Sequence, residues 1–166
     1  MNSEYQTIIH PIEPLYDASS EKLILGSLPS VKSREAMFFY GHPQNRFWKL
    51  LALLYDEETP VTIEEKKRLA LSHHIAMWDS IHSCEIIGSS DSSVRNVVPN
   101  DLSLILSNSK VERIFCNGAL SYKIYMKYIF PVTGIKATKL PSTSPANAAF
   151  SLDRLARSWS VIKDYL

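Results

Sequence analysis

Short apolar runs alternate with amphipathic segments along this chain, and that alternation restricts its fold more than any other feature. Lys22–Gly26 reads KLILG and Arg113–Asn117 reads RIFCN, which predicts two buried strands. Over Asn45–Tyr55, apolar residues recur three and four positions apart, which predicts a helix. Strands that alternate with helices form a parallel sheet covered on both faces. The sequence therefore predicts an α/β fold of this kind.

The other predicted elements follow from the same patterns. Thr62–Glu65 is a capping box that begins a helix, which we expect His73 and His74 to close. The stretch Ser83–Pro99 is rich in Ser, Asn and Gly, and we predict that it is mostly loop. The remaining predictions are strands over Ile75–Ile81 and Ile135–Leu140, a short helix over Asn100–Asn108 capped by Asn100, a helix from Gly118 to about Phe130, and a last helix over Phe150–Leu166 with Leu152, Leu155, Trp159 and Ile162 on one face.

Composition limits the classes of protein that the chain can be. Its 166 residues suit a single domain over 1–166, and a net charge of +1 means that any binding of nucleic acid depends on a local basic patch. Cys84 and Cys116 are far apart without CxxC spacing, so we expect no disulfide framework, no metal site and no iron–sulfur cluster. The first residues lack a signal-peptide pattern, and no apolar stretch approaches the roughly 20 residues of a membrane helix. We expect a cytoplasmic, monomeric protein without cofactors.

Ligands of such folds bind beyond the carboxyl ends of the strands. That rule selects four polar or glycine-containing loops, namely Ser27–Asn45, Asp79 and the residues after it, Asn117–Gly118 and Pro141–Asn147. Asp79 could hydrogen-bond a base or position water, or it could cap a turn. For Asn117 we favour a structural role in the turn between strand and helix.

The first of these loops combines a tight turn with aromatic and amide side chains. Gly26–Ser30 brings backbone amides close to a ligand, and three aromatic residues and His42-Pro-Gln-Asn45 follow without an obvious core to fill. Such a mixture suits a flat heterocycle on which Phe39 or Tyr40 stacks while His42 and Asn45 reach its edge. Asn45 is equally suited to cap the next helix, and there we expect Trp48 to be core.

The last loop, Leu140–Asn147, is rich in Ser and Thr. Ser144-Pro145 looks like a cap followed by proline at the first position of a helix. Hydroxyls and free amides at a helix N-terminus can bind a phosphate of DNA. Any helix could begin with this pattern.

Four segments together resemble the hypoxanthine-DNA glycosylase family, a branch of the uracil-DNA glycosylase superfamily. They are Ile24–Ser30, Tyr40–Trp48, Ser83–Glu85 with Ser89–Ser93, and Leu140–Asn147. The resemblance covers the chain from about Ile9 to the last helix, and the Tyr40–Trp48 run is its most specific part. It implies a three-layer α/β/α sandwich with a central four-stranded parallel sheet. It also implies a monofunctional glycosylase, without metal or cofactor, that removes a deaminated base from damaged DNA, with hypoxanthine favoured and uracil next.

The resemblance also implies roles for individual residues. Gly26–Ser30 matches the first motif of the superfamily and Leu140–Asn147 the second, while Asp79 is near the position of a base-reading Asn in several relatives. Many members carry an Asp or Asn in the first motif that positions water, and this chain has Ser27, Leu28, Pro29 and Ser30 there. The predicted site consists of catalytic Asn45 and His42, a base pocket of Gly26, Ser27, Leu28, Phe39, Tyr40 and Asp79, and DNA-binding Ser30, Lys32, Pro141, Ser142, Ser144 and Asn147, with Arg34, Arg46 and Lys139 completing the basic patch.

Two other classes of function compete with this hypothesis. A non-catalytic α/β module could use the same pocket to bind nucleic acid, and the missing first-motif carboxamide keeps that alternative open. A nucleotide or small-molecule hydrolase is disfavoured because the sequence has no P-loop, no GxSxG elbow and no HExxH helix.

Overall fold

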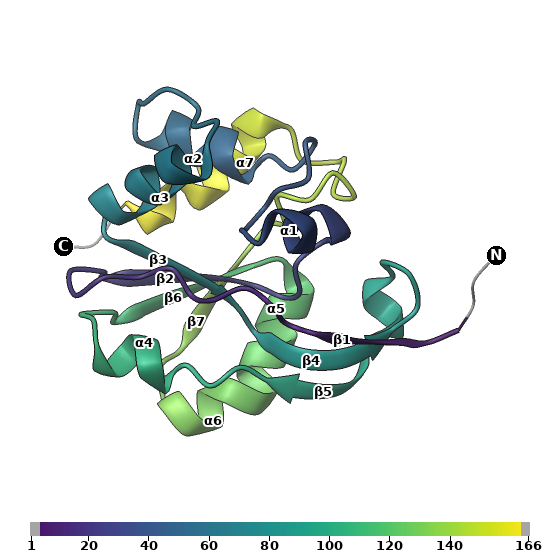
Figure 1. Cartoon of the computed structure of the whole chain (residues 1–166). Coiled ribbons are helices and arrows are strands. Elements are labelled where there is room, and N and C mark those ends of the chain that lie inside the picture. The colour runs from purple at the N-terminus through teal and green to yellow at the C-terminus, as the bar shows by residue number, and fades with distance from the viewer. Residues whose placement is uncertain (1–3, 164–166) are drawn as a thin grey trace.

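A four-stranded parallel sheet in the order β3-β2-β6-β7 forms the centre of the structure, a computed structural model that describes residues 4–163. Its strands are β2 (Lys22–Gly26), β3 (Ile75–Asp79), β6 (Arg113–Asn117) and β7 (Ala137–Leu140). The predicted parallel sheet between helices is therefore confirmed (Figure 1). In the strand register, Gly26 of β2 lies opposite Asp79 of β3, and Asn117 of β6 lies opposite Leu140 of β7. The loops that follow these strands therefore begin at one edge of the sheet.

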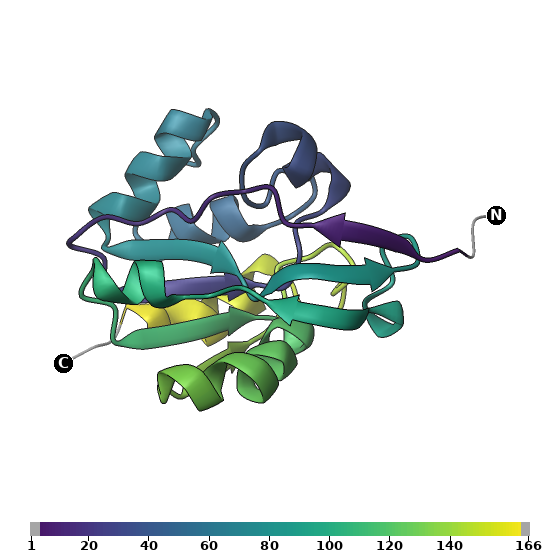
Figure 2. The same cartoon turned by 60° about the horizontal axis from the view of Figure 1, so that its bottom comes forward.

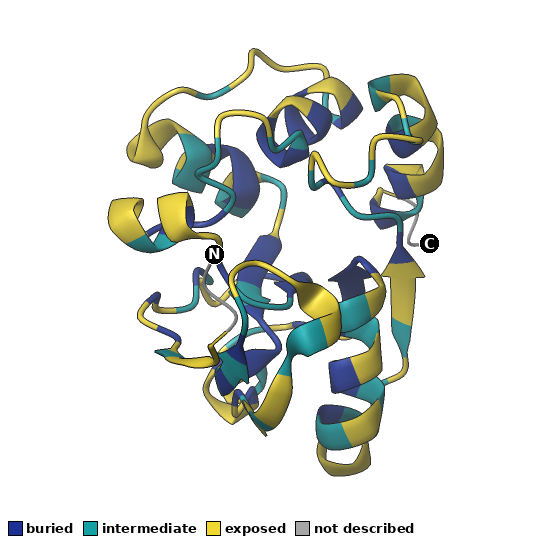
Figure 3. Cartoon of the chain, turned by 90° about the vertical axis from the view of Figure 1, so that its right-hand side faces the viewer, coloured by how far each residue is buried: buried dark blue, intermediate teal, exposed yellow. Residues whose placement is uncertain are grey.

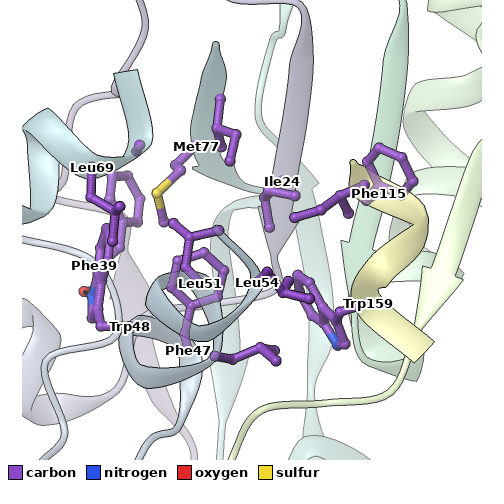
Figure 4. Close-up of a cluster of buried hydrophobic side chains, with 14 of the residues drawn as sticks. Ile24, Phe39, Phe47, Trp48, Leu51, Leu54, Leu69, Met77, Phe115 and Trp159 are labelled. Carbon is purple, nitrogen blue, oxygen red and sulfur yellow. Dashed lines mark hydrogen bonds between the residues drawn. The ribbon is translucent and has the colours of Figure 1, made fainter. Parts of the chain in front are cut away.

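Helices cover both faces of this sheet because the central strands are apolar on both sides. Ile24 of β2 packs into a cluster with α2 (Phe47–Leu54), α3 (Ile63–Ser72) and α7 (Leu152–Trp159), which Figure 4 shows. Leu23 and Leu25 point to the other face, toward α4 (Ser103–Ser107), α5 (Ala119–Ile124), the π-helical turn η2 (Tyr125–Ile129) and α6 (Phe130–Thr133). All five residues of β2 are buried, as a central parallel strand requires.

The helix predictions are largely confirmed, with shifted ends. Helix α3 begins at the predicted capping box, in which Thr62 accepts from the Glu65 amide, and it ends before His73. Helix α2 begins two residues after the predicted start, and α7 is followed by a 3₁₀ turn, η3 (Ser160–Ile162). The apolar face of the last helix buries Leu155, Trp159 and Ile162 as predicted, and its predicted end at 164–166 lies outside the described residues.

The prediction that Ser83–Pro99 is mostly loop is wrong. A second, antiparallel sheet in the order β1-β4-β5 consists of β1 (Gln6–Ile9), β4 (Ile81–Ile86) and β5 (Arg95–Pro99), with a 3₁₀ turn η1 (Asp91–Ser93) between the last two. Only Ser80 separates β4 from β3, so the predicted strand Ile75–Ile81 is two strands. This sheet extends past the carboxyl ends of the parallel strands (Figure 2) and covers a third apolar cluster that contains Ile81, Cys84 and Ile86.

Asn100 does not cap α4, which begins at Ser103 after Leu102. Its buried side chain donates instead to the carbonyl oxygens of Asp79 at 2.8 Å and Ile81 at 3.1 Å. This position fixes the junction between the two sheets, because it satisfies the polar backbone groups where β3 turns into β4.

One short helix and one long loop shape the functional face. Helix α1 (Val31–Ala36) follows β2 directly, and its N-cap Ser30 accepts from the Ser33 amide. No helix begins at Pro145, contrary to the prediction, because residues 141–150 form turns and α7 starts only at Leu152. Within the described part of the chain, no helix is long and apolar enough to cross a membrane.

Candidate functional site

A cavity of about 840 Å³ opens at the carboxyl edge of the parallel sheet. Figure 3 views the molecule from that side, with buried strand segments in the middle and exposed turns around them. Every predicted site residue except Lys32 lines the cavity, as do Arg34 and Lys139 of the basic patch. Thr143 and Asn117 line it from two of the selected loops, and the loop that contains Gly88 and Ser89 adds a wall that the sequence did not predict.

The amide of Asn45 is held by a hydrogen-bond network that joins the first loop of the site to the 141–150 loop. Its Oδ1 accepts from the Phe47 amide and from the Thr143 hydroxyl, each at 2.9 Å. The Thr143 hydroxyl in turn accepts from Asn117 Nδ2 at 3.0 Å, and Asn117 Oδ1 accepts from the Thr143 amide at 3.0 Å. Asn45 therefore supports the start of α2 through the Phe47 amide, although the cap residue is Arg46 and not Asn45 as predicted. Asn117 has a structural role, but it supports Thr143 in the 141–150 loop and not the turn between β6 and α5.

These bonds determine which end of the Asn45 amide faces the cavity. Two donors occupy the oxygen, so the nitrogen is the end that remains, with two N–H groups to offer. No described residue accepts a hydrogen bond from it. The cavity thus presents an oriented amide donor on a rigid support.

Arg46 holds the 141–150 loop in place. Its guanidinium donates to the carbonyl oxygens of Ser144 at 2.9 Å and Asn147 at 3.0 Å, and also to that of Phe150. Its backbone amide donates to the Thr143 carbonyl at 3.1 Å. Three protein carbonyls thus occupy the terminal nitrogens of Arg46, which ties the 141–150 loop to the start of α2.

The same loop uses its own backbone amides internally. The Ser144 amide donates to Ser142 Oγ, the Ala146 amide to Ser144 Oγ, and the Asn147 amide to the Ser144 carbonyl. The free amides expected of a helix N-terminus are consequently absent from these positions. The hydroxyl hydrogens of Ser142 and Ser144 can donate to an anion from this segment.

A buried His–Asp pair lies behind the cavity, and its Asp79 lines the cavity together with Gly26. His10 Nε2 lies 2.7 Å from Asp79 Oδ2, and both side chains are almost fully buried. The other His10 nitrogen, Nδ1, accepts from the Ile12 amide at 3.3 Å, so Nε2–H is the group that donates a hydrogen bond to the carboxylate. Sequence reasoning missed His10, because its partner is 69 positions away. Asp79 does not act as the cap of a turn, which was the alternative prediction.

Glycine at position 26 leaves the space that Asp79 and Tyr40 occupy. A Cβ on Gly26 would lie 2.3 Å from Asp79 Oδ1 and 3.0 Å from the Tyr40 hydroxyl. Both polar atoms therefore converge on one point above the end of β2. Burial raises the pKa of the Tyr40 phenol far above its usual range, the nearby Asp79 carboxylate raises it further, and the Asn117 side chain opposes both. Tyr40 thus keeps its proton.

The aromatic residues of the first loop are less free than the sequence suggested. Phe38 and Phe39 belong to the core around Trp48, which was correctly predicted to be buried, and the Trp48 indole donates to the Phe39 carbonyl at 3.0 Å. The interpretation that these aromatics lack a core to fill is wrong for both. Tyr40 packs face to face on Phe47, with ring centroids 4.3 Å apart, and its hydroxyl is buried.

His42 lies half-buried at the cavity wall. Its Nδ1 accepts from the Gln44 amide at 3.1 Å, which leaves Nε2 as the nitrogen that carries the proton of a neutral ring. Over residues 4–163, no three His, Cys, Asp or Glu side chains are grouped so that they could hold a metal ion, and Cys84 and Cys116 are both unpaired and buried.

The fold and the position of the cavity define an α/β/α protein of the uracil DNA glycosylase-like class. The structure aligns with the solution NMR structure of a Methanosarcina acetivorans protein provisionally assigned as a uracil DNA glycosylase, with a TM-score of 0.80 and 30% sequence identity. That alignment covers 95% of this chain and 96% of the other. The three-layer sandwich implied by the sequence is thereby confirmed.

Two curated relatives narrow the class to a family. A hypoxanthine DNA glycosylase of Methanosarcina acetivorans is 35% identical over 142 residues, which are 83% of this chain and 87% of the relative. One of Methanosarcina barkeri is 29% identical over 136 residues, which are 81% and 85% of the two chains. No protein-family model matches the sequence. The chain belongs to the hypoxanthine DNA glycosylase family, and hence to the DNA glycosylases, which hydrolyse N-glycosyl bonds.

Proposed function

We propose that this protein removes hypoxanthine from damaged DNA by hydrolysing the bond between the base and its deoxyribose. The observation that carries the proposal is the Asn45 amide, whose nitrogen is turned into the cavity by two donors on its oxygen. An N–H group in that position suits the carbonyl oxygen of a deaminated base. The names of the two curated relatives support hypoxanthine as the preferred base, and uracil, which also carries carbonyl groups, is the second candidate.

The reaction begins when the damaged nucleotide is flipped out of the duplex into the cavity, because a glycosylase cannot reach the glycosidic bond of a stacked base. Extrusion costs a few kcal/mol and is cheapest for a mispaired base. The glycosidic bond then breaks, positive charge grows on the sugar and negative charge grows on the leaving base. Asn45 Nδ2 and His42 Nε2 stabilise that negative charge as donors. Water then adds to C1′ of the sugar cation and gives up a proton, the departed base takes up a proton, and an abasic site remains.

The DNA strand lies across the mouth of the cavity. Arg34 and Lys139 line it, and Ser142 and Ser144 bring hydroxyl donors to the same rim, while Lys32 contributes a side chain that is exposed beside it. With a net charge of only +1, attraction to phosphate depends on this local group. Binding should weaken as salt concentration rises, because each phosphate contact releases counterions.

The test is base release from labelled duplexes that contain one hypoxanthine, uracil, xanthine or mispaired thymine, in the presence of a chelator. We expect strand cleavage only after treatment with alkali, which reveals abasic sites, and the fastest release from hypoxanthine. Asn45→Ala should retain DNA binding and lose at least about tenfold in release, since one donor to a developing anion contributes about 10²–10³ in rate. Salt-sensitive binding without abasic product from any duplex would instead support a non-catalytic binding module.

A further inference from the structure

The loop between β4 and β5 brings a carboxylate to the cavity from outside the parallel sheet. Asp91 lines the cavity together with Gly88 and Ser89 of this loop. Among the residues that the structure describes, the other acidic residue that lines it is Asp79, which is buried and paired with His10. The Asp91 side chain forms no hydrogen bond or ion pair with any described residue. Its carboxylate is therefore available to a ligand or to water.

Hydrogen bonds within this loop fix the backbone that carries Asp91. The Ser93 hydroxyl accepts from the Ile87 amide at 2.8 Å and donates to the Ser90 carbonyl at 2.7 Å. The Val94 amide donates to the Asp91 carbonyl at 3.3 Å, which closes the 3₁₀ turn η1. Asp91 thus belongs to a turn with its own internal support, so its carboxylate is held at the cavity rim although the loop is open to solvent.

The cavity has its carboxylate and its amide donor on different walls. Val94, directly after η1, packs against the third apolar cluster, and so does Leu28 of the first loop, which joins the β4–β5 loop to the site. Figure 1 shows the turn between β4 and β5 below α1 and the 141–150 loop above it. Asn45 is bound to the 141–150 loop through Thr143. A base and its sugar between these walls would therefore have the amide on one side and the carboxylate on the other.

Hydrolysis of a glycosidic bond needs a proton acceptor as well as donors. The donors Asn45 and His42 face the negative charge of the leaving base, whereas the attacking water must lose a proton as its oxygen bonds to the sugar. The turn Ser27–Ser30 after β2 contains no carboxylate or amide side chain that could orient this water. Partial burial raises the pKa of the Asp91 carboxyl above its usual range, which makes its carboxylate a stronger base. The residue is also exposed at the rim, so water can reach it.

We propose that the Asp91 carboxylate orients the water that attacks the sugar and accepts the proton of that water. This inference rests on the proposed function. The glycosidic bond breaks first, and its electron pair leaves with the base. The water oxygen then bonds to C1′ of the sugar cation while one O–H bond breaks and its proton passes to Asp91. The base anion takes up a proton from solvent and Asp91 returns one to solvent, which restores the carboxylate for the next turnover.

The first experiment compares Asp91→Asn with the parent in single-turnover release of hypoxanthine. We expect release to fall by about 10- to 100-fold, because a positioned proton acceptor contributes about 10²–10⁴ in rate and the new amide still binds water. Affinity for a duplex with 2′-fluorodeoxyinosine, whose glycosidic bond breaks slowly, should be equal or higher, because negative charge near the phosphates is removed. A parental rate, or affinity lost together with rate, would overturn the inference. No release by the parent from any damaged duplex would instead refute the proposed function.

The matched control is Asp153→Asn, which makes the same change of charge at an exposed residue in the first turn of α7, outside the cavity. It should release hypoxanthine at the parental rate, and thermal unfolding checks that all variants fold. In Asp91→Ala the rim has room for a small carboxylate, so added formate should restore part of the release, whereas it should not restore release by Asn45→Ala. Release that formate does not restore, or that chloride restores equally, would overturn the role of Asp91 as a base.

Discussion

Thr143→Val tests whether the network behind Asn45 serves catalysis. Valine has nearly the shape of threonine, and Thr143 is fully buried, so the substitution preserves packing while it removes the hydroxyl. Two hydrogen bonds disappear with it, the one that the hydroxyl donates to Asn45 Oδ1 at 2.9 Å and the one that it accepts from Asn117 Nδ2 at 3.0 Å. Asn117 Oδ1 still accepts from the backbone amide of residue 143.

The effect on stability and the effect on rate have different origins. Asn117 Nδ2 becomes a buried donor without its partner, which costs about 1–3 kcal/mol of the free energy of unfolding. Asn45 Oδ1 keeps only the Phe47 amide, so the Asn45 amide can turn over and present oxygen where the leaving base needs a donor. We therefore expect base release to fall by at least about tenfold, toward the loss of about 10²–10³ that removal of the donor itself causes.

The assay is single-turnover release of hypoxanthine, with DNA affinity and thermal unfolding measured on the same samples. Thr143→Ser keeps the hydroxyl and should release base at close to the parental rate. Because the two residues act as a unit, Thr143→Val should add little to the defect of Asn45→Ala in the double variant. A Thr143→Val protein that is less stable but as fast as the parent would refute the catalytic reasoning and leave the network a purely structural role.

Three further predictions concern parts of the fold around the site. Arg46→Met removes the guanidinium that holds the carbonyls of the 141–150 loop, so we expect faster hydrogen exchange in that loop and slower base release; unchanged exchange would contradict the clamp. Thr62→Ala removes the cap of α3 and should lower the free energy of unfolding by about 1 kcal/mol in urea titrations, with base release unchanged because α3 begins on the exposed surface. Burial raises the pKa of the Cys116 thiol to about 12 and that of Cys84 above its usual range, so neither should react with iodoacetamide at pH 8 until urea unfolds the protein. Since the unfolded thiols ionise first, these two groups should also favour unfolding as the pH rises from about 9 toward 12, which denaturation curves across that range would detect.

The parallel sheet could be predicted because its signal is local. The run KLILG is apolar on both faces of a strand, and only a sheet covered on both sides buries such a strand. The capping box at Thr62 and the apolar face of the last helix are equally local, and both were found where the pattern indicated. The same rules selected the loops at the carboxyl edge of the sheet, which is why most of the predicted site residues line one cavity.

The antiparallel sheet escaped prediction because its strands are polar on the face that is open to solvent. In β4 only Ile81, Cys84 and Ile86 are buried, and exposed or half-exposed residues separate them. Its pairing with β1 joins segments more than 70 positions apart, since Ile9 lies opposite Ser83. A composition rich in Ser, Asn and Gly describes a loop equally well, and only the tertiary pairing decides between the two.

The sequence by itself therefore determined which residue types gather at the carboxyl edge, because strand order and loop position follow from local apolar patterns. Tertiary structure decided what each of them does. The bond between Asn45 and Thr143 joins residues 98 positions apart, and the bond between His10 and Asp79 spans 69 positions. Such contacts depend on how two loops approach in space, and no local pattern records that approach. The direction of the Asn45 amide, on which the proposed chemistry depends, exists only in the folded chain.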